Sequence, residues 1–448
     1  MDSIIQQMRA IRLALRKNEV WRNVDFDDFL TDDLVSPSLD DSYEYTYRCN
    51  IPDLDTDRLA LVNGYCRQPL QVLPNGIVMG GLREARRQYP DLVQRYFGSC
   101  ATKTVTRSFT TMQDEAFGKG MVNPYLDINT EHYTDGLFVY IPDGVKVQKP
   151  LQFLSVIRSD HPLMLQTRNL VYVGRGSQVA IIHCDDSYDQ NSSFSNNVTE
   201  IFADEGALVE HYKMQNLNAQ SALLNQTYTT LQRDASLRSI AISINGGHIR
   251  NHSEIRMNGE GCETQAHGLY LIDKEEQVDN YIFVEHSHPN CHSNELFKGI
   301  MDDAARATFN GHVLVSDGAA KTEAYQSNKN ILMTDKAVVN TKPFLEIYND
   351  DVKCSHGSTI GQLDEQALFY IRSRGVSERT AKTMLLYAFC DEVIQKIAIP
   401  ALRERLSDMV KKRLHGELNV CSDCALHCST PCNGEEAGAT FKIDVSKL

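Results

Sequence analysis

Three groups of cysteine and histidine residues have the chemistry and spacing to bind a transition metal. The shortest group is Cys354-Ser-His356. Residues i and i+2 of an extended segment project to the same face, so a thiolate and an imidazole could meet one metal there. Because two ligands do not complete a tetrahedral site, the others would have to come from another strand or another chain. A purely structural pair is the alternative.

The densest group lies near the end of the sequence, where four cysteines fall within twelve residues. They could enclose zinc or an iron–sulfur cluster, although their spacing differs from the C-x2-C-x2-C-x3-C run of bacterial ferredoxins. A reduced tail that binds no metal is the alternative. The residues are Cys421, Cys424, Cys428 and Cys432, with His427 beside them.

The third group is the segment 285–292, which contains His286, His288, Cys291 and His292. Strand alternation would place His286 and His288 on one face, and their imidazoles could hold a soft or borderline metal. We interpret these side chains instead as hydrogen-bonding residues within the fold. A stable structural zinc is not expected at this place.

The composition excludes several functional classes. Of the 448 residues, 42% are hydrophobic and 23% are charged, which is typical of a folded globular protein of about three domains. The formal net charge of −14 disfavours nucleic-acid binding. No apolar run approaches the roughly 18 residues of a membrane span, and no signal peptide is evident. We therefore expect a cytoplasmic protein whose twelve cysteines are reduced.

The common catalytic and nucleotide-binding motifs are missing from the sequence. It contains no GxxxxGK[ST] phosphate loop, and Gly174-Arg-Gly176 lacks the third glycine of a dinucleotide fingerprint. It also contains neither a GxSxG elbow nor an HExxH pair. We expect the chain to bind no ATP or NAD through such motifs and to be non-catalytic.

The candidate residues must be positioned by a long segment rich in β-strands. From about 136 to 350, short apolar runs read as strands, and small turn residues recur at Gly176, Gly206, Ala235 and Gly261. These positions are 30, 29 and 26 residues apart. Repeats of 20 to 50 residues made only of strands predict a parallel β-helix. A β-sandwich remains the alternative.

Helices are predicted on both sides of this core. Apolar residues at helical spacing indicate a helix near residues 4–15, and another is expected at 82–97. After Gly361 the chain is again helical, with Ser377 as a helix cap and Pro400 as a point of division. The predicted domains are a mainly helical 1–100, a β-helix 101–356, a helical 357–418 and a cysteine-rich tail 419–448.

The segment 341–375 resembles a known family. It reads TKPFLEIYNDDVKCSHGSTIGQLD, followed after three residues by LFYIRSRG. Similar likeness is seen in the upstream segments FKG at 297–299, FNG at 309–311 and KTEAYQ at 321–326. Over roughly residues 60–410 the chain resembles the SufD branch of the SufB/SufD family, subunits of the SUF iron–sulfur cluster assembly system.

The resemblance implies a right-handed parallel β-helix between helical domains. It implies a scaffold that pairs with a SufB-like paralogue and binds the ABC-type ATPase SufC, with a homodimer possible in isolation. Cys354 and His356 match the family's CSHG motif, at which a transient cluster would be shared with SufB. The SufC-docking region would include Phe369, Tyr370, Arg372, Arg374, Gly375 and Met384.

Two alternatives to this identification stay open at the level of sequence. The nearer is a SufB paralogue that itself carries the cluster scaffold site, although the CSHG motif and its lead-in favour the SufD branch. The more distant is a carbohydrate-active β-helix enzyme with Asp185 and Asp186 in a groove. The sequence does not show whether a flavin binds.

Overall fold

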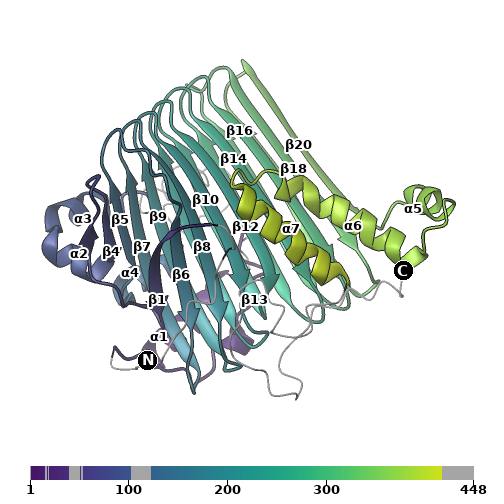
Figure 1. The fold of residues 1–448 in the computed structure, drawn as a ribbon, viewed down its shortest axis with the longest axis horizontal. Helices are drawn as coiled ribbons and strands as arrows, with labels where there is room; N and C mark the ends of the chain where they lie inside the picture. Colours follow the sequence, from purple (N-terminus) through teal and green to yellow (C-terminus); the bar gives the residue numbers. More distant parts are fainter. Residues whose placement is uncertain are drawn as a thin grey trace.

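The computed structural model describes residues 2–15, 18, 20–39, 51, 54–101 and 123–415. Its centre is a parallel β-solenoid of about eight turns, flanked by helices at both ends of the chain (Figure 1). The predicted mainly β fold with flanking helices is confirmed. Within the described residues, no helix combines the length and the apolar character that a membrane span requires.

The strands of the described residues form two sheets of ten strands each. The first, which we call the C-side sheet, faces the C-terminal helices (Figure 1). In spatial order it contains β2 (Tyr65–Cys66), β1 (Asp57–Val62), β6 (Leu151–Ile157), β8 (Gln178–Ser187), β10 (Leu208–Asn216), β12 (Ser236–Asn245), β14 (Glu263–Ile272), β16 (His292–Met301), β18 (Thr322–Leu332) and β20 (Val352–Gly361).

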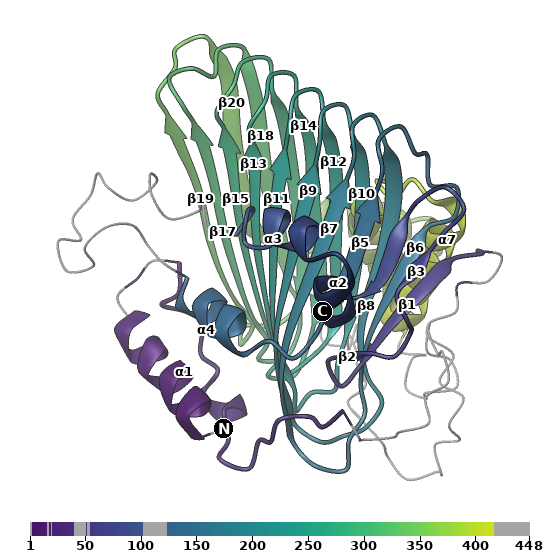
Figure 2. The same cartoon turned by 90° about the vertical axis from the view of Figure 1, so that its left-hand side faces the viewer.

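The second sheet, the N-side sheet, faces the N-terminal helices (Figure 2). From the opposite end of the solenoid it contains β19 (Val338–Ile347), β17 (Arg306–Val315), β15 (Gln277–His286), β13 (His248–Met257), β11 (Ala222–Leu231), β9 (Ser193–Ala203), β7 (Leu163–Val173), β5 (Leu137–Ile141), β4 (Val78–Gly81) and β3 (Gln71–Val72).

Turns with left-handed backbone conformations stack where the chain crosses into the C-side sheet. Gly176, Gly206 and Gly261 have φ values of 61°, 63° and 74°, and Asp234 and Asn290 occupy equivalent turns with φ of 58° and 60°. These residue types tolerate positive φ at low cost. The sequence pattern placed the third turn one residue late, at Ala235. The error arose because an aspartate, rather than a glycine, adopts the left-handed conformation there.

Alternating apolar side chains fill the space between the two sheets. Val179, Val209 and Leu237 are buried at equivalent positions of successive C-side strands, and Ile201 and Ile255 lie in the opposite sheet within the same core. Each fully buried aliphatic side chain contributes about 1.5–3 kcal/mol to folding. The register between neighbouring coils is therefore set by a continuous column of hydrophobic contacts.

The N-side sheet is covered by helices from the first third of the chain (Figure 2). They are α1 (Asp2–Leu15), the 3-10 turn Asp27–Phe29, α2 (Leu82–Gln88), α3 (Pro90–Tyr96) and α4 (Pro124–His132). The helix expected at 82–97 is thus divided into two, because Pro90 begins a new helix at its first position.

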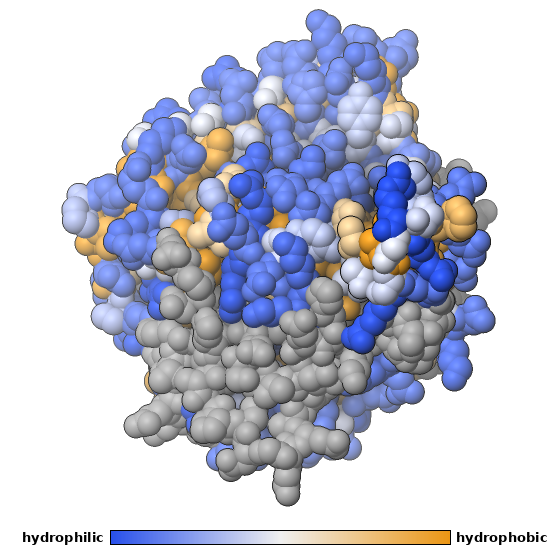
Figure 3. All heavy atoms as spheres, turned by 45° about the vertical axis from the view of Figure 1, so that its right-hand side comes forward, coloured by the Kyte–Doolittle hydropathy of each residue, from blue (hydrophilic) through white to orange (hydrophobic). Residues whose placement is uncertain are grey.

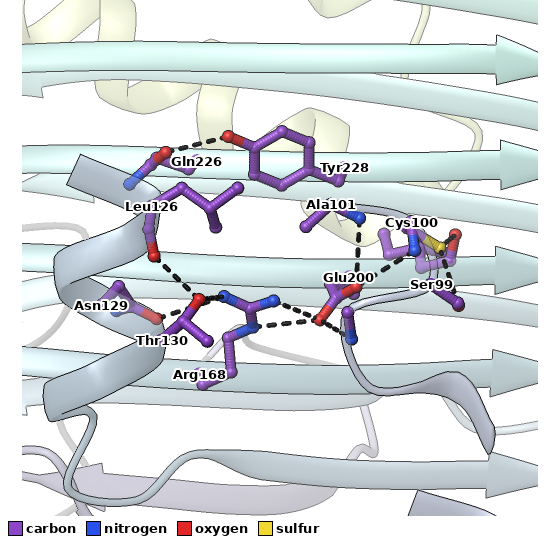
Figure 4. A network of polar contacts seen from close by, with 12 residues as sticks. Ser99, Cys100, Ala101, Leu126, Asn129, Thr130, Arg168, Glu200, Gln226 and Tyr228 are labelled. Atoms are coloured by element: carbon purple, nitrogen blue, oxygen red, sulfur yellow. Dashed lines mark hydrogen bonds and ion pairs between the residues drawn. The ribbon is translucent and has the colours of Figure 1, made fainter. Parts of the chain in front are cut away.

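A buried ion pair fixes α4 and the segment after α3 to the N-side sheet (Figure 4). Arg168 Nη2 lies 2.6 Å from Glu200 Oε1, and both side chains are almost fully buried. Glu200 also accepts hydrogen bonds from the backbone N–H groups of Gly98, Cys100 and Ala101. One carboxylate therefore joins two strands to the backbone that follows α3.

The C-side sheet is covered by two long helices. α6 (Glu378–Ile394) and α7 (Pro400–His415) bury Leu386, Val393, Leu402 and Leu406 against the outer face of the sheet. As predicted, Ser377 caps α6 and Pro400 separates it from α7. The shorter α5 (Glu365–Arg372) has no buried residue and projects from the solenoid in Figure 1.

The strands extend beyond the predicted limits of the β-helix. β1 lies within the predicted helical domain 1–100 and pairs in parallel with β6, and β20 continues past residue 356 to Gly361. The division into domains itself stays a prediction, because strand limits do not define independently folding units.

Candidate functional site

The last coil of the solenoid leaves one edge of each sheet unpaired among the described residues. β19 pairs only with β17 in its sheet, and β20 pairs only with β18. Each of these strands is ten residues long. Among the described residues, no further coil packs on the inward-facing side chains of β19 and β20. We call the layer formed by these side chains the open layer.

Cys354 and His356 lie on the inward face of β20 in this open layer. Cys354 pairs in register with Ala324 and packs against the small cluster of Val313, Val315, Ala319 and Ala324. Its thiol is half-buried, and burial raises its pKa. His356, two residues further along, is exposed. The two side chains therefore share one face, as their i and i+2 spacing predicts.

A column of polar residues lies beneath His356. His356 is in register with Gln326 of β18, which is in register with Glu295 of β16. Gln326 Nε2 donates a hydrogen bond to Glu295 Oε2 at 2.7 Å, and both side chains are buried. Burial without a cationic partner raises the pKa of Glu295 to about 8. The sequence did not indicate this column, because its members are about thirty residues apart.

The rim of the open layer is partly apolar. Thr341 of β19 and Ser358 of β20 bridge the two sheets through their hydroxyls at 2.7 Å. Figure 3 shows hydrophobic residues interrupting a largely hydrophilic surface on this side of the molecule. Between 40% and 55% of the side chain is exposed at Tyr325, Val338, Phe344, Ile347, Tyr348 and Ile360. Such exposed apolar side chains beside free strand edges are typical of a surface that another chain covers.

The residues expected to dock an ATPase form a second exposed surface on α5 and α6. Phe369 is 74% exposed, Tyr370 60% and Met384 50%. The Arg374 guanidinium lies over the Tyr370 ring at 3.5 Å, and Arg372 pairs with Glu378 at 3.0 Å. Gly375 ends this segment with φ of 87°, a conformation that favours glycine. Five of the six residues thus lie on or directly after α5, which buries no residue, and Met384 lies on the neighbouring α6.

The other candidate groups differ in their surroundings. His286 is buried and hydrogen-bonds Ser293 Oγ at 2.9 Å, and Cys291 is buried as well, whereas His288 and His292 are exposed. Among the described residues, no three histidine, cysteine, aspartate or glutamate side chains are grouped so as to hold a metal ion. The four cysteines of the tail, Cys421, Cys424, Cys428 and Cys432, lie outside the described residues.

The carboxylates considered for a carbohydrate-active enzyme do not line an open groove. Asp185 and Asp186 are buried, with 3% and 4% of their surface exposed. Asp185 Oδ2 lies 3.1 Å from Lys213 Nζ, which is itself buried inside the solenoid. Neither carboxylate could reach a polymer bound on the surface.

Comparison with known proteins gives a consistent family assignment. Residues 155–389 match the family described as "SUF system FeS cluster assembly, SufBD core domain", and residues 2–153 match "SufBD protein N-terminal region". The chain is 29% identical over 420 residues to the iron–sulfur cluster assembly SufBD family protein slr0076 of Synechocystis, covering 90% of this chain and 88% of that protein.

Two further relatives are named SufD. The iron–sulfur cluster assembly protein SufD of Escherichia coli is 26% identical over 422 residues, covering 92% of each chain. The protein of the same name from Bacillus subtilis is 22% identical over 341 residues, covering 76% of this chain and 74% of the relative. With more than half of its length matched by the core domain of the family, this chain belongs to the SufBD family of iron–sulfur cluster assembly proteins.

Proposed function

We propose that this chain is the SufD-type scaffold subunit of a SUF complex and has no catalytic activity of its own. The observation that carries the proposal is the last coil, which presents Cys354 and His356 beside two strand edges that no described segment pairs with. A thiol and an imidazole are suitable ligands for iron, but they are only two of the ligands that a cluster needs. The remaining ligands would come from a partner chain.

The proposed partner is a SufB-like paralogue that covers the open end of the β-helix. Backbone N–H and C=O groups along β19 and β20 are available for pairing with strands of another chain. The exposed apolar rim would be buried at the same time, which adds hydrophobic stabilisation. In the absence of that partner, a second copy of this chain could cover the same surface.

The iron–sulfur cluster would be cargo that is built or loaded at the junction of the two chains. Cys354 and His356 would hold it transiently from one side, while the SufB-like chain would hold it from the other. No ATP is proposed to bind to this chain. We propose instead that an ABC-type ATPase, SufC, docks on α5 and α6 through Phe369, Tyr370 and Met384, with Arg372, Arg374 and Gly375 beside them.

The cluster site is tested by reconstitution of the complex with a SufB-like and a SufC-like partner. We expect His356→Ala to remove most of the cluster absorbance and bound iron after anaerobic supply of iron and sulfide. Ser355→Ala is the matched control, because Ser355 is exposed on the same strand and faces away from the interior. Equal cluster yields in the two variants would contradict a role for His356.

The docking surface is tested by co-purification with the ATPase. The double variant Phe369→Ser and Tyr370→Ser should lose SufC while retaining the SufB-like partner, because α5 has no buried residue and projects from the solenoid in Figure 1. Leu13→Ser is the control, since Leu13 is 62% exposed on α1 at the other side of the molecule. Unchanged ATPase recovery with the double variant would exclude α5 as the docking helix.

A cytoplasmic location is proposed for the assembly.

A further inference from the structure

Two cysteines are neighbours in a column of small residues that runs along one corner of the solenoid. The backbone carbonyl of one column residue accepts a hydrogen bond from the strand of the next coil. Thus His292 N donates to Cys262 O at 2.9 Å, and Glu263 N donates to Ala235 O at 3.1 Å. In order along the solenoid the column is Ser177, Ala207, Ala235, Cys262, Cys291 and Thr322.

The thiols of Cys262 and Cys291 converge on one acceptor. Cys262 Sγ lies 3.2 Å from the carbonyl oxygen of Gly259, and Cys291 Sγ lies 3.3 Å from the same oxygen. Both cysteines are free thiols. Neighbouring parallel strands are about 4.8 Å apart, which falls within the range of Cα separations, about 4.4–6.8 Å, that a disulfide bridges. The backbone therefore already has the spacing that a bond between the two sulfurs requires.

The surroundings favour a thiolate on Cys291. The contact between the two cysteine side chains lowers the pKa of Cys291 and raises the pKa of Cys262. The nearby His286 ring lowers the pKa of Cys291 further. His286 is fully buried, and its Nδ1 has no hydrogen-bond partner among the described residues. This ring nitrogen is thus able to form a hydrogen bond with one of the two thiols.

Both cysteines lie directly beneath surface turns. They are themselves fully buried, but the turns 259–261 and 288–290 above them contain the exposed residues Glu260 and His288. A small reagent therefore needs only a local opening of two turns, not the unfolding of a coil, to reach the sulfurs.

We propose that Cys262 and Cys291 form a redox-active dithiol that a hydroperoxide converts to a disulfide between two consecutive coils. The Cys291 thiolate attacks the terminal oxygen of the peroxide, the O–O bond breaks, and Cys291 becomes a sulfenic acid. The other oxygen leaves as hydroxide or alkoxide and takes up the proton that the Cys291 thiol released, which gives water or an alcohol. Cys262 then attacks this sulfur, the S–O bond breaks, and water leaves with the proton of Cys262. Two thiols lose two electrons, the peroxide gains them, and a dithiol reductant reverses the change.

The disulfide would lie close to the candidate cluster site. Counting along the C-side sheet, the strand that follows Cys291 is two positions from β20, or about 10 Å. Ala319 and Ala324 occupy the layer between, and Cys354 packs against them. Oxidation would add a direct covalent cross-link between two coils whose only other covalent connection is the main chain itself.

The test uses the purified full chain, first reduced and then treated with hydrogen peroxide. Remaining thiols are blocked with N-ethylmaleimide in denaturant, and the protein is digested without reduction and mapped by mass spectrometry. We expect a cross-linked peptide that contains Cys262 and Cys291 and that disappears with dithiothreitol. Cys390, which is equally buried and whose pKa burial raises to about 12, should remain unmodified. Absence of that peptide, or linkage of either thiol to a different cysteine, would overturn the proposal.

A matched variant separates the two thiols. Cys262→Ser should fold, because Ser177 occupies the same column position in an earlier coil, and the serine hydroxyl keeps a hydrogen-bond donor beside Cys291. In this variant peroxide should leave Cys291 as a sulfenic acid that dimedone traps, whereas the wild type should accumulate little adduct. The melting temperature should rise on oxidation in the wild type and stay constant in Cys262→Ser. A dimedone adduct of equal yield in both proteins would also overturn the proposal.

Discussion

The two ends of the β-helix differ in how their terminal strands are protected. At the first end, the edges are the two-residue strands β2 and β3, which pair antiparallel with β1 and β4. Helices α2 and α3 bury Leu82, Ala85 and Val93 beside this end. At the other end, β19 and β20 are ten residues long, and no described segment pairs with their outer edges.

This difference contrasts an end that covering helices protect with an end whose terminal strands have no pairing partner among the described residues. Short antiparallel edges and covering helices are the usual means by which soluble proteins prevent unwanted strand pairing. A solenoid whose last coil lacks such protection exposes apolar and backbone groups that a terminal cap would otherwise cover.

The largest effect is expected from loss of the Glu200 carboxylate, which fixes the segment after α3, a helix that covers the protected end, to the N-side sheet. Glu200→Ala would leave the Arg168 guanidinium buried without its anion and would remove the acceptor for three backbone N–H groups. We expect the free energy of unfolding to fall by about 3–5 kcal/mol, as measured by urea denaturation. Glu205→Ala breaks an exposed pair with Arg233 and should cost less than about 1 kcal/mol. Similar losses in both variants would mean that the buried pair does not hold this end together.

A smaller effect that depends on pH is expected beneath the open end, at Glu295. Its folded-state pKa of about 8 lies above the ordinary value of 4.5, so the unfolded chain releases this proton at lower pH. The protonated carboxyl therefore makes its full contribution to the free energy of unfolding below about pH 4.5. That contribution is lost as the pH rises toward about 8. At pH 9, Glu295→Gln should be more stable than the wild type by about 1–3 kcal/mol.

The control for Glu295 is the same comparison at pH 4.5. Both proteins then carry a neutral group at this position, and their urea midpoints should agree. Glu276, whose pKa burial also raises to about 8, is present in both proteins and does not affect the difference. A stability difference that is the same at pH 4.5 and pH 9 would contradict the titration of Glu295.

The smallest effect on stability is expected at the open rim. Ile360→Lys changes a side chain that is 49% exposed, so the isolated chain should lose no more than about 0.5 kcal/mol. The same charge should prevent pairing with a SufB-like chain, because it would be buried at the interface without a partner. Co-purification measures the pairing, and Leu13→Lys on α1 serves as an exposed apolar control. Normal recovery of the partner with Ile360→Lys would exclude this rim as the interface.

Local patterns in the sequence were sufficient to predict the flanking helices. They also predicted that Cys354 and His356 lie on the same face of a strand. Helical spacing predicted α1, Ser377 and Pro400 marked the limits of α6 and α7, and an i, i+2 spacing placed Cys354 and His356 together. These features depend on residues within a few positions of one another. The resemblance of 341–375 to the SufD branch was equally local, and the family match confirmed the family.

The sequence by itself thus determined the β-helix, its flanking helices and the identity of the residues in the last coil. Only the tertiary structure decided which residues meet across coils: Glu295 with Gln326, Cys262 with Cys291, and Asp185 with Lys213. The physical reason is the length of the coil. Partners in adjacent coils are about thirty residues apart, and an uncertainty of one residue in a turn, as at Asp234, changes which side chains face the interior.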